Sequence, residues 1–413
     1  MSRLTAFYVG DDRDAVLQRM EFAREIDALI PGFSRVHYSD WGAVLERYWR
    51  EAPKDSVLVI DELPSLVEAS PELPSLLQKA IDREQRAIIL CGSSQRMMQG
   101  LVLDASAPLY GRAREILHVM PLAPKWILPA LQRRDAVQAI HHYATWGGVP
   151  RYWELAREYR THAEAVKELV LSPNGVLHRE PERLLLDDTR ETARAASILT
   201  LIGNGAHRLS EIASRLSMPA TSLTRPIARL IDLGLVAKET PFGTHEKTSK
   251  RTLYRIADPF LGFWYRFVEP NRSRLGSGQL DLVMADWKRA WPQFLGTAWE
   301  SMVRVAIAHR PVSGQRWLPA RRFWGSSNHR KSTLEIDAVA QAADGSDKLL
   351  VAEAKLSLGA NELGPSLAAL EHKARACFDH RFAIVPVVFV LQLKGTKKNS
   401  AVFGPEFVLG DER

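Results

Sequence analysis

The sequence predicts an α/β protein, and three observations lead to this prediction. Residues 1–124 alternate short apolar runs, typical of strands, with longer amphipathic runs, typical of helices. Strand and helix patterns return in residues 290–413. The chain has 413 residues and is 46% apolar, so it can bury a substantial core divided among two or three domains.

The first domain is predicted at residues 1–124. Its expected elements, in chain order, are a strand at 4–10, a helix at 15–29, a strand at 56–62, a helix at 72–84 and a strand at 86–94. Strands that are separated by helices indicate a parallel sheet with crossover helices.

Two carboxylates, Asp61 and Glu62, directly follow an apolar run in this domain. The pattern is typical of the second half of an ATP-hydrolysing site, where the Asp helps to hold magnesium and the Glu orients or deprotonates the attacking water. The first half needs a glycine-rich loop ending in Gly-Lys, whose amides and lysine surround the phosphates. No Gly-Lys dipeptide occurs in the chain, so we expect weak ATP binding and impaired hydrolysis.

The middle of the chain is predicted to be mostly helical. A helical lid subdomain is expected at 125–195 and a winged helix at 196–270, the latter ending in two strand-like runs around a polar hairpin. The glycine- and serine-bearing stretch 271–279 is predicted to be a linker.

The last helix of the predicted winged helix carries two arginines, Arg225 and Arg229, four residues apart. They point away from the apolar face, which is formed by Leu223, Ile227, Leu230 and Ile231. Guanidinium groups placed in this way suit phosphate or guanine contacts in a DNA major groove. The alternatives are a solvated face and a docking surface for the first domain. Pro226 is expected near the helix start, because proline breaks a helix interior.

A further domain is predicted at 285–413, and it contains three acids and a lysine: Glu300, Asp337, Glu353 and Lys355. Glu353 and Lys355 are two apart on one strand and so share a face. Asp337 is expected to end the adjacent strand, joined through an Asp-Gly turn near 344. Converging carboxylates can hold magnesium, with Lys355 positioning a nucleophile. The alternative is a surface ion pair between Glu353 and Lys355.

Several runs together resemble a known family. "VLVIDEL", "IILCGSS", "APLYGRARE", "TWGGVPRYW" and "LYRIADPFLGFWYRFV" are similar to prokaryotic P-loop ATPases of the AAA/STAND type, often called archaeal-type ATPases, over nearly all of the chain. The resemblance implies ATP and magnesium as cofactors, with Ser93, Ser94 and Arg112 joining Asp61 at the nucleotide. Members of that family begin with the phosphate loop, so this chain is expected to start downstream of it.

The acidic pattern of the last domain resembles the restriction-endonuclease-like, or PD-(D/E)xK, superfamily. The resemblance implies that Asp337 and Glu353 bind the metal and that Glu300 is the acid of the first core helix. Ile336 stands where that motif usually has its proline.

Charge and composition limit the partners. A net charge of +7 fits a polyanion such as DNA. The two cysteines, Cys91 and Cys377, indicate reduced thiols rather than a disulfide framework or a zinc site. No apolar run reaches the length of a membrane span and the start has no signal-peptide pattern, so no membrane partner and a cytoplasmic location are predicted. A homo-oligomer is left open.

These patterns predict an ATPase-family, DNA-associated protein with a magnesium-dependent, nuclease-like C-terminal domain. Two alternatives remain open. One is a non-catalytic, nucleotide-dependent switch or DNA-binding regulator, and the other is a remnant without biochemical activity.

Overall fold

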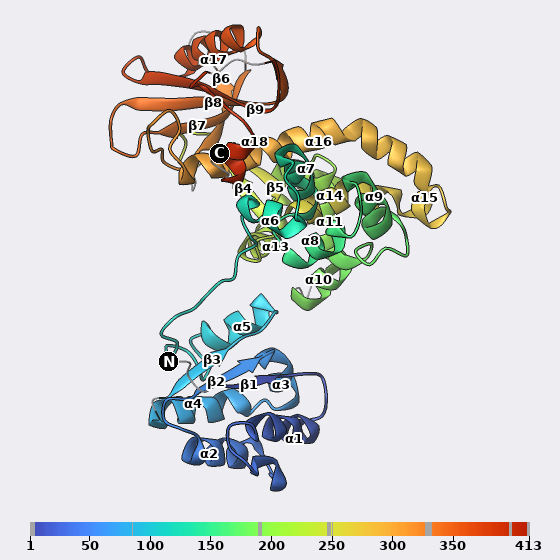
Figure 1. Ribbon diagram of the computed structural model, residues 1–413, viewed down its shortest axis with the longest axis vertical. Coiled ribbons are helices and arrows are strands. Elements are labelled where there is room, and N and C mark those ends of the chain that lie inside the picture. The colour runs from blue at the N-terminus through green and yellow to red at the C-terminus, as the bar shows by residue number, and fades with distance from the viewer. Residues whose placement is uncertain are drawn as a thin grey trace. The chain divides into compact units, whose positions relative to one another are not determined.

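The computed structural model describes residues 5–84, 86–188, 192–245, 249, 251–326, 333–395 and 399–410. The chain forms two compact units (Figure 1). The first comprises Met1–Val119 with Leu184–Arg190, and the second comprises Met120–Arg183 with Glu191–Arg413.

The first unit contains a parallel sheet in the order β1-β2-β3. Its elements are β1 (Thr5–Val9), α1 (Ala15–Ile26), α2 (Trp41–Glu51), β2 (Val57–Asp61), α3 (Leu63–Ala69), α4 (Leu73–Glu84), β3 (Ala87–Leu90) and α5 (Gln95–Val102). The α/β class and the parallel sheet agree with the sequence prediction. The sequence analysis did not predict α2, which begins where the Asp40 side chain accepts a hydrogen bond from the Ala43 amide.

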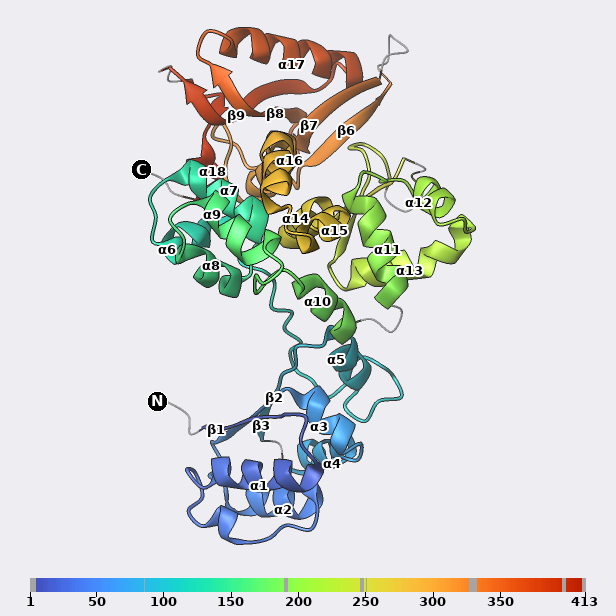
Figure 2. The ribbon, with the colours of Figure 1, turned by 90° about the vertical axis from the view of Figure 1, so that its right-hand side faces the viewer.

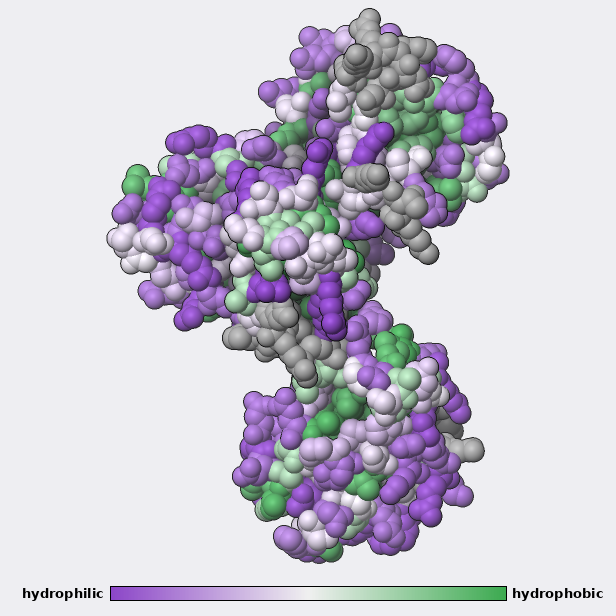
Figure 3. All heavy atoms as spheres, turned by 180° about the vertical axis from the view of Figure 1, so that it is seen from behind, coloured by the Kyte–Doolittle hydropathy of each residue, from purple (hydrophilic) through white to green (hydrophobic). Residues whose placement is uncertain are grey.

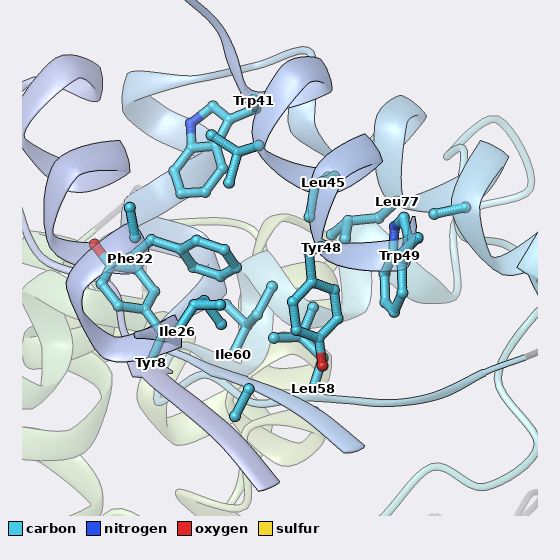
Figure 4. Packing of buried hydrophobic residues seen from close by; sticks show 14 of the residues in the cluster. Tyr8, Phe22, Ile26, Trp41, Leu45, Tyr48, Trp49, Leu58, Ile60 and Leu77 are labelled. Atoms are coloured by element: carbon cyan, nitrogen blue, oxygen red, sulfur yellow. The ribbon is translucent and has the colours of Figure 1, made fainter. Parts of the chain in front are cut away.

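The core of this unit lies between one face of the sheet and the helices α1, α2 and α4 (Figure 1). The ring of Phe22 packs edge to face against Tyr8 and against Trp41, and all three side chains are buried (Figure 4). On β1, alternate residues point to the opposite face, so Phe7 and Val9 remain about half exposed.

The second unit begins with helices. They are α6 (Ile127–Leu131), α7 (Ala136–Trp146), α8 (Pro150–Arg157), α9 (His162–Val166) and α10 (Glu180–Asp188), whose residues from Leu184 onward are counted with the first unit. Then come α11 (Thr192–Gly203), α12 (Leu209–Arg215), α13 (Ala220–Asp232), the antiparallel pair β4 (Val236–Glu239) and β5 (Leu253–Ile256), α14 (Pro259–Phe267), α15 (Arg272–Gly276) and α16 (Leu280–His309).

Two sequence predictions about this region were wrong. The stretch predicted as a linker forms α15, because Leu275 is buried and fixes it against the fold. Pro226 lies inside α13 rather than near its start, and the helix continues through it to Asp232. A proline costs a helix one backbone hydrogen bond, and the buried face of α13, with Leu223, Ile227 and Leu230, offsets that loss.

The second unit ends in a mixed sheet in the order β10-β9-β8-β7-β6. Its elements are β6 (Arg321–Ser326), β7 (Thr333–Gln341), β8 (Lys348–Gly359), α17 (Leu363–Cys377), β9 (Ala383–Lys394), β10 (Val402–Phe403) and α18 (Pro405–Leu409). Helix α17 covers one face and the C-terminal part of α16 covers the other (Figure 2). The buried Trp299 of α16 donates to the Phe389 carbonyl of β9, which fixes the helix to the sheet.

The β4–β5 hairpin is joined to this sheet. The Phe242 amide donates to the Arg322 carbonyl of β6 at 2.9 Å. The Phe242 ring packs beside Phe323 and Phe378 against the sheet core. The three-helix module α11–α13 is therefore tied to the C-terminal sheet through its hairpin.

Among the described residues, no helix combines the length and the apolarity needed to cross a bilayer. The face drawn in Figure 3 is mostly hydrophilic, with hydrophobic residues in small separate areas.

Candidate functional site

The β7–β8 hairpin positions the first predicted acid of the C-terminal domain. The two strands pair from Gln341–Leu349 to Ala338–Ala352, and the Asp-Gly turn has Gly345 at φ +79. Beyond the last pair, Asp337 Oδ2 accepts a hydrogen bond from the Ala354 amide at 2.9 Å. The sequence analysis expected Asp337 at the end of its strand, but it lies in the middle of β7. Its side chain takes the place of a backbone hydrogen bond between the two strands.

Glu353 and Lys355 lie next to each other on β8. Lys355 Nζ is 3.0 Å from Glu353 Oε2, and Lys373 Nζ of α17 is 2.6 Å from Glu353 Oε1. Burial acts to raise the pKa of Glu353, but hydrogen bonds from Lys373 and Lys355 outweigh it and hold this pKa below its usual value. Glu353 is therefore charged and neutralised by the protein's own lysines.

The acid on α16, Glu300, is coupled to this pair through Asp337. Burial, and then the negative charge of Asp337, raise the pKa of Glu300 from 4.5 to about 7. Burial also raises the pKa of Asp337, with a smaller contribution from Glu353. Asp337 thus lies close enough to Glu300 to oppose its ionisation, and Glu353 close enough to oppose that of Asp337.

Arg304, which the sequence analysis missed, contacts two of these elements. Its Nη1 donates to the Asp337 carbonyl at 3.0 Å and lies 3.8 Å from Glu300 Oε2. Its Nη2 lies 3.8 Å from Glu239 Oε1 on β4. The spacing of four residues from Glu300 on one helix was a signal in the sequence that could have identified it.

The predicted metal ligands Asp337 and Glu353 lie on the paired strands β7 and β8, but they are not arranged as a cation site. Within the described ranges, no three His, Cys, Asp or Glu side chains are grouped so that they could hold a metal. The two acids also have partners of their own, because two lysines contact both oxygens of Glu353 and a backbone amide donates to one oxygen of Asp337.

In the first unit, Asp61, Glu62 and Ser93 meet at the carboxyl edge of the parallel sheet. Asp61 Oδ1 accepts from the Glu62 amide at 3.0 Å, and Ser93 Oγ donates to Glu62 Oε2 at 3.1 Å. Glu62 has φ +50, a backbone conformation that non-glycine residues adopt rarely and often at functional positions.

Two other residues predicted at the nucleotide have hydrogen bonds to different partners. Ser94 is buried and caps α5 by accepting from the Met97 amide. Arg112 makes two 2.9 Å bonds to Asp82, which lies in the last turn of α4 and so at the opposite edge of the sheet, where β3 begins. The placement of Arg112 gives no support to its predicted role at a nucleotide.

The two arginines of α13 differ in exposure. Arg225 is exposed, as expected for a side chain that points away from the apolar face, whereas Arg229 is partly buried. Its Nη2 is enclosed and has no hydrogen-bond partner among the described residues. Arg229 is therefore less accessible to DNA than the sequence analysis expected.

Comparisons with known proteins give the following similarities. A family model described as "Archaea bacterial proteins of unknown function" (DUF234) matches residues 264–363, which include all four predicted residues of the C-terminal site. An uncharacterised protein of Methanocaldococcus jannaschii, MJECL04, is 28% identical over 311 residues, covering 73% of this chain and 68% of that protein.

Two solved structures are similar at lower identity. The Walker-type ATPase PABY2304 of Pyrococcus abyssi has a TM-score of 0.48 and 18% identity, covering 64% of this chain and 84% of that one. The ORC1 protein of Aeropyrum pernix, solved in complex with DNA, has a TM-score of 0.31 and 16% identity, covering 66% of this chain and 80% of that one. Function must therefore come from the residues of this chain.

Proposed function

We propose that this chain is a DNA-associated protein of ATPase-like architecture whose C-terminal domain carries a magnesium-dependent, nuclease-like site. The observation that carries the proposal is the geometry around Asp337: its carboxylate accepts from the backbone of the strand that bears Glu353 and Lys355, and Arg304 links its carbonyl to Glu300. Lys355 lies 3.0 Å from Glu353. The net charge of +7 fits a DNA partner.

The donor set suits magnesium, since this ion prefers carboxylate oxygens. Asp337 and Glu353 would hold it, with Glu300 next to them. When bound, magnesium neutralises charge on a phosphodiester and makes a bound water easier to ionise.

The chain's own residues would perform the remaining tasks. Lys355, on the same strand face as Glu353, would position the attacking water. Glu300, with a pKa of about 7, can take up or release a proton near neutral pH. Arg304, which contacts the Asp337 backbone and Glu300, would hold these two acids in register.

Nicking of supercoiled plasmid DNA by the full chain tests the proposal. We expect nicking in Mg²⁺ or Mn²⁺ that EDTA stops and that Asp337→Asn and Lys355→Ala abolish. Lys348→Ala is the matched control, because Lys348 is an exposed lysine of the same strand and lies outside the acid group. Nicking that survives Asp337→Asn, or the absence of nicking with either metal, would contradict the nuclease assignment.

A second candidate is a non-catalytic, nucleotide-dependent switch in which the C-terminal domain is a scaffold. Its support is the group of Asp61, Glu62 and Ser93 at the sheet edge. Among the described residues, β3 is an edge strand, and Ile89 on it is about half exposed, as is Phe7 on the same face of the sheet. A strand and helix carrying a phosphate-binding loop would fit beside β3, and nucleotide affinity in this proposal depends on such a segment.

A further inference from the structure

Lys373 of α17 leads to an inference that rests on the proposed nuclease-like site and concerns its regulation. Its Nζ lies 2.6 Å from Glu353 Oε1, while Lys355 Nζ lies 3.0 Å from Glu353 Oε2. The side chain of Glu353 is only 15% exposed. Both oxygens of a largely buried carboxylate are thus engaged by ammonium groups.

This double pairing opposes metal binding by Glu353 in the arrangement described. Each oxygen already accepts from one ammonium group, and the two positive charges repel a divalent cation that approaches the same carboxylate. Glu353 therefore binds a divalent cation more favourably when one of the two lysines moves away.

The two lysines differ in how they are held. Lys355 is two residues from Glu353 on the same strand, so the backbone keeps it close. Lys373 reaches Glu353 from a helix through a flexible four-carbon stem, and its side chain is 29% exposed. Its ammonium group can turn to another anion without any movement of the backbone. A phosphate of DNA bound over the acids is such an anion.

We propose that Lys373 is a removable counter-ion. In the free protein it neutralises Glu353, and a phosphate of bound duplex DNA draws it away, which opens Glu353 to a divalent cation. Metal and DNA then favour each other's binding by the same factor, because coupling between two sites is reciprocal. The arrangement keeps the acids from loading metal when no DNA is present. The competing interpretation is an ion pair that only fastens α17 to the sheet.

The test measures the Mn²⁺ affinity of the full chain by electron paramagnetic resonance, with and without a short duplex DNA. Lys373→Gln is expected to tighten Mn²⁺ binding without DNA by roughly tenfold to a hundredfold, the range of one charge-assisted hydrogen bond. Adding duplex should raise the Mn²⁺ affinity of the unsubstituted chain by a similar factor. It should change the Mn²⁺ affinity of Lys373→Gln little. Arg375→Gln is the matched control, since it removes the same charge from the same helix but from a residue paired with Glu371.

Each outcome decides between the interpretations. Equal Mn²⁺ affinities in the unsubstituted chain and Lys373→Gln, both lost in Asp337→Asn, would reject the counter-ion role and leave the nuclease-like site standing. No Mn²⁺ site in either protein, with or without duplex, would reject both proposals. If Lys373→Gln does not fold, the test uses the unsubstituted chain alone. A Mn²⁺ affinity of that chain that does not change when duplex is added rejects the counter-ion role.

Discussion

Glu300 is the residue whose protonation reports most directly on the crowding of acids in the C-terminal domain. Its pKa is raised from 4.5 to about 7 by burial and by Asp337. Between these two values the folded protein keeps a proton that the unfolded chain releases. The stability that depends on Glu300 is therefore fully present below about pH 4.5 and is lost as the pH rises through about 7.

We therefore predict that Glu300→Gln stabilises the protein at pH 8, in buffer containing EDTA, by about 3 kcal/mol and has little effect below pH 4.5. Glutamine keeps the size of the side chain and cannot ionise. The measurement is urea unfolding at a series of pH values, with Glu371→Gln, at a partly exposed glutamate of α17, as control. A difference between Glu300→Gln and the unsubstituted chain that does not change with pH would show that the pKa of Glu300 is not raised in the folded protein.

The sequence identified some residues of this site and missed others for a physical reason. Glu353 and Lys355 were predictable, because the two-residue period of a strand places them on one face. Lys373 was not, since it reaches Glu353 from a helix twenty positions away, and only the packing of α17 on the sheet brings it there. Long-range ion pairs leave no periodic signal in a sequence.

At the scale of elements, local turn chemistry was predicted better than helix boundaries. The Asp-Gly turn gave the β7–β8 hairpin correctly. Pro226 and the stretch at 271–279 were misjudged, because proline and glycine weaken helices locally while buried contacts such as Leu275 stabilise them. Tertiary packing outweighs local preference at both places.

Helix α13 gives a prediction about DNA. Arg225 is exposed and can reach a phosphate, whereas Arg229 is partly enclosed. Arg225→Ala is therefore expected to weaken duplex binding and to flatten its dependence on salt by about one unit in a log-log plot, since each phosphate contact contributes roughly 0.9. The control is Arg215→Ala on α12, which removes an arginine paired with Glu211. An unchanged slope for Arg225→Ala would assign α13 a purely structural role.

At the scale of the whole molecule, the parallel sheet of the first unit was predictable, and the position of Arg112 was not. The alternation of strands and helices gave the parallel sheet. The meeting of Asp61, Glu62 and Ser93 follows from neighbouring parallel strands. The position of Arg112 depends on its hydrogen bond to Asp82, and no pattern in the sequence predicts that bond.

The incomplete site predicts weak nucleotide binding. A chain of residues 1–413 should bind ATP only at roughly millimolar concentration and should not hydrolyse it measurably, because it has no Gly-Lys loop to hold the phosphates. Calorimetry and phosphate release measure these two quantities. Micromolar affinity, with turnover that Glu62→Gln abolishes, would be incompatible with this expectation. Reading the DNA upstream of the Met1 codon for a glycine-rich GK[ST] segment would show whether a phosphate loop is encoded there.

The most direct test of the central claim is the number of Mn²⁺ ions bound per chain when the full protein is saturated with duplex DNA. The claim is that Asp337 and Glu353 form a divalent-metal site, so the unsubstituted chain should bind at least one Mn²⁺ that Asp337→Asn and Glu353→Gln both lose. Competition by Mg²⁺ should release the same ion. Identical Mn²⁺ binding by the unsubstituted chain and Asp337→Asn, measured under the same conditions, would contradict the account.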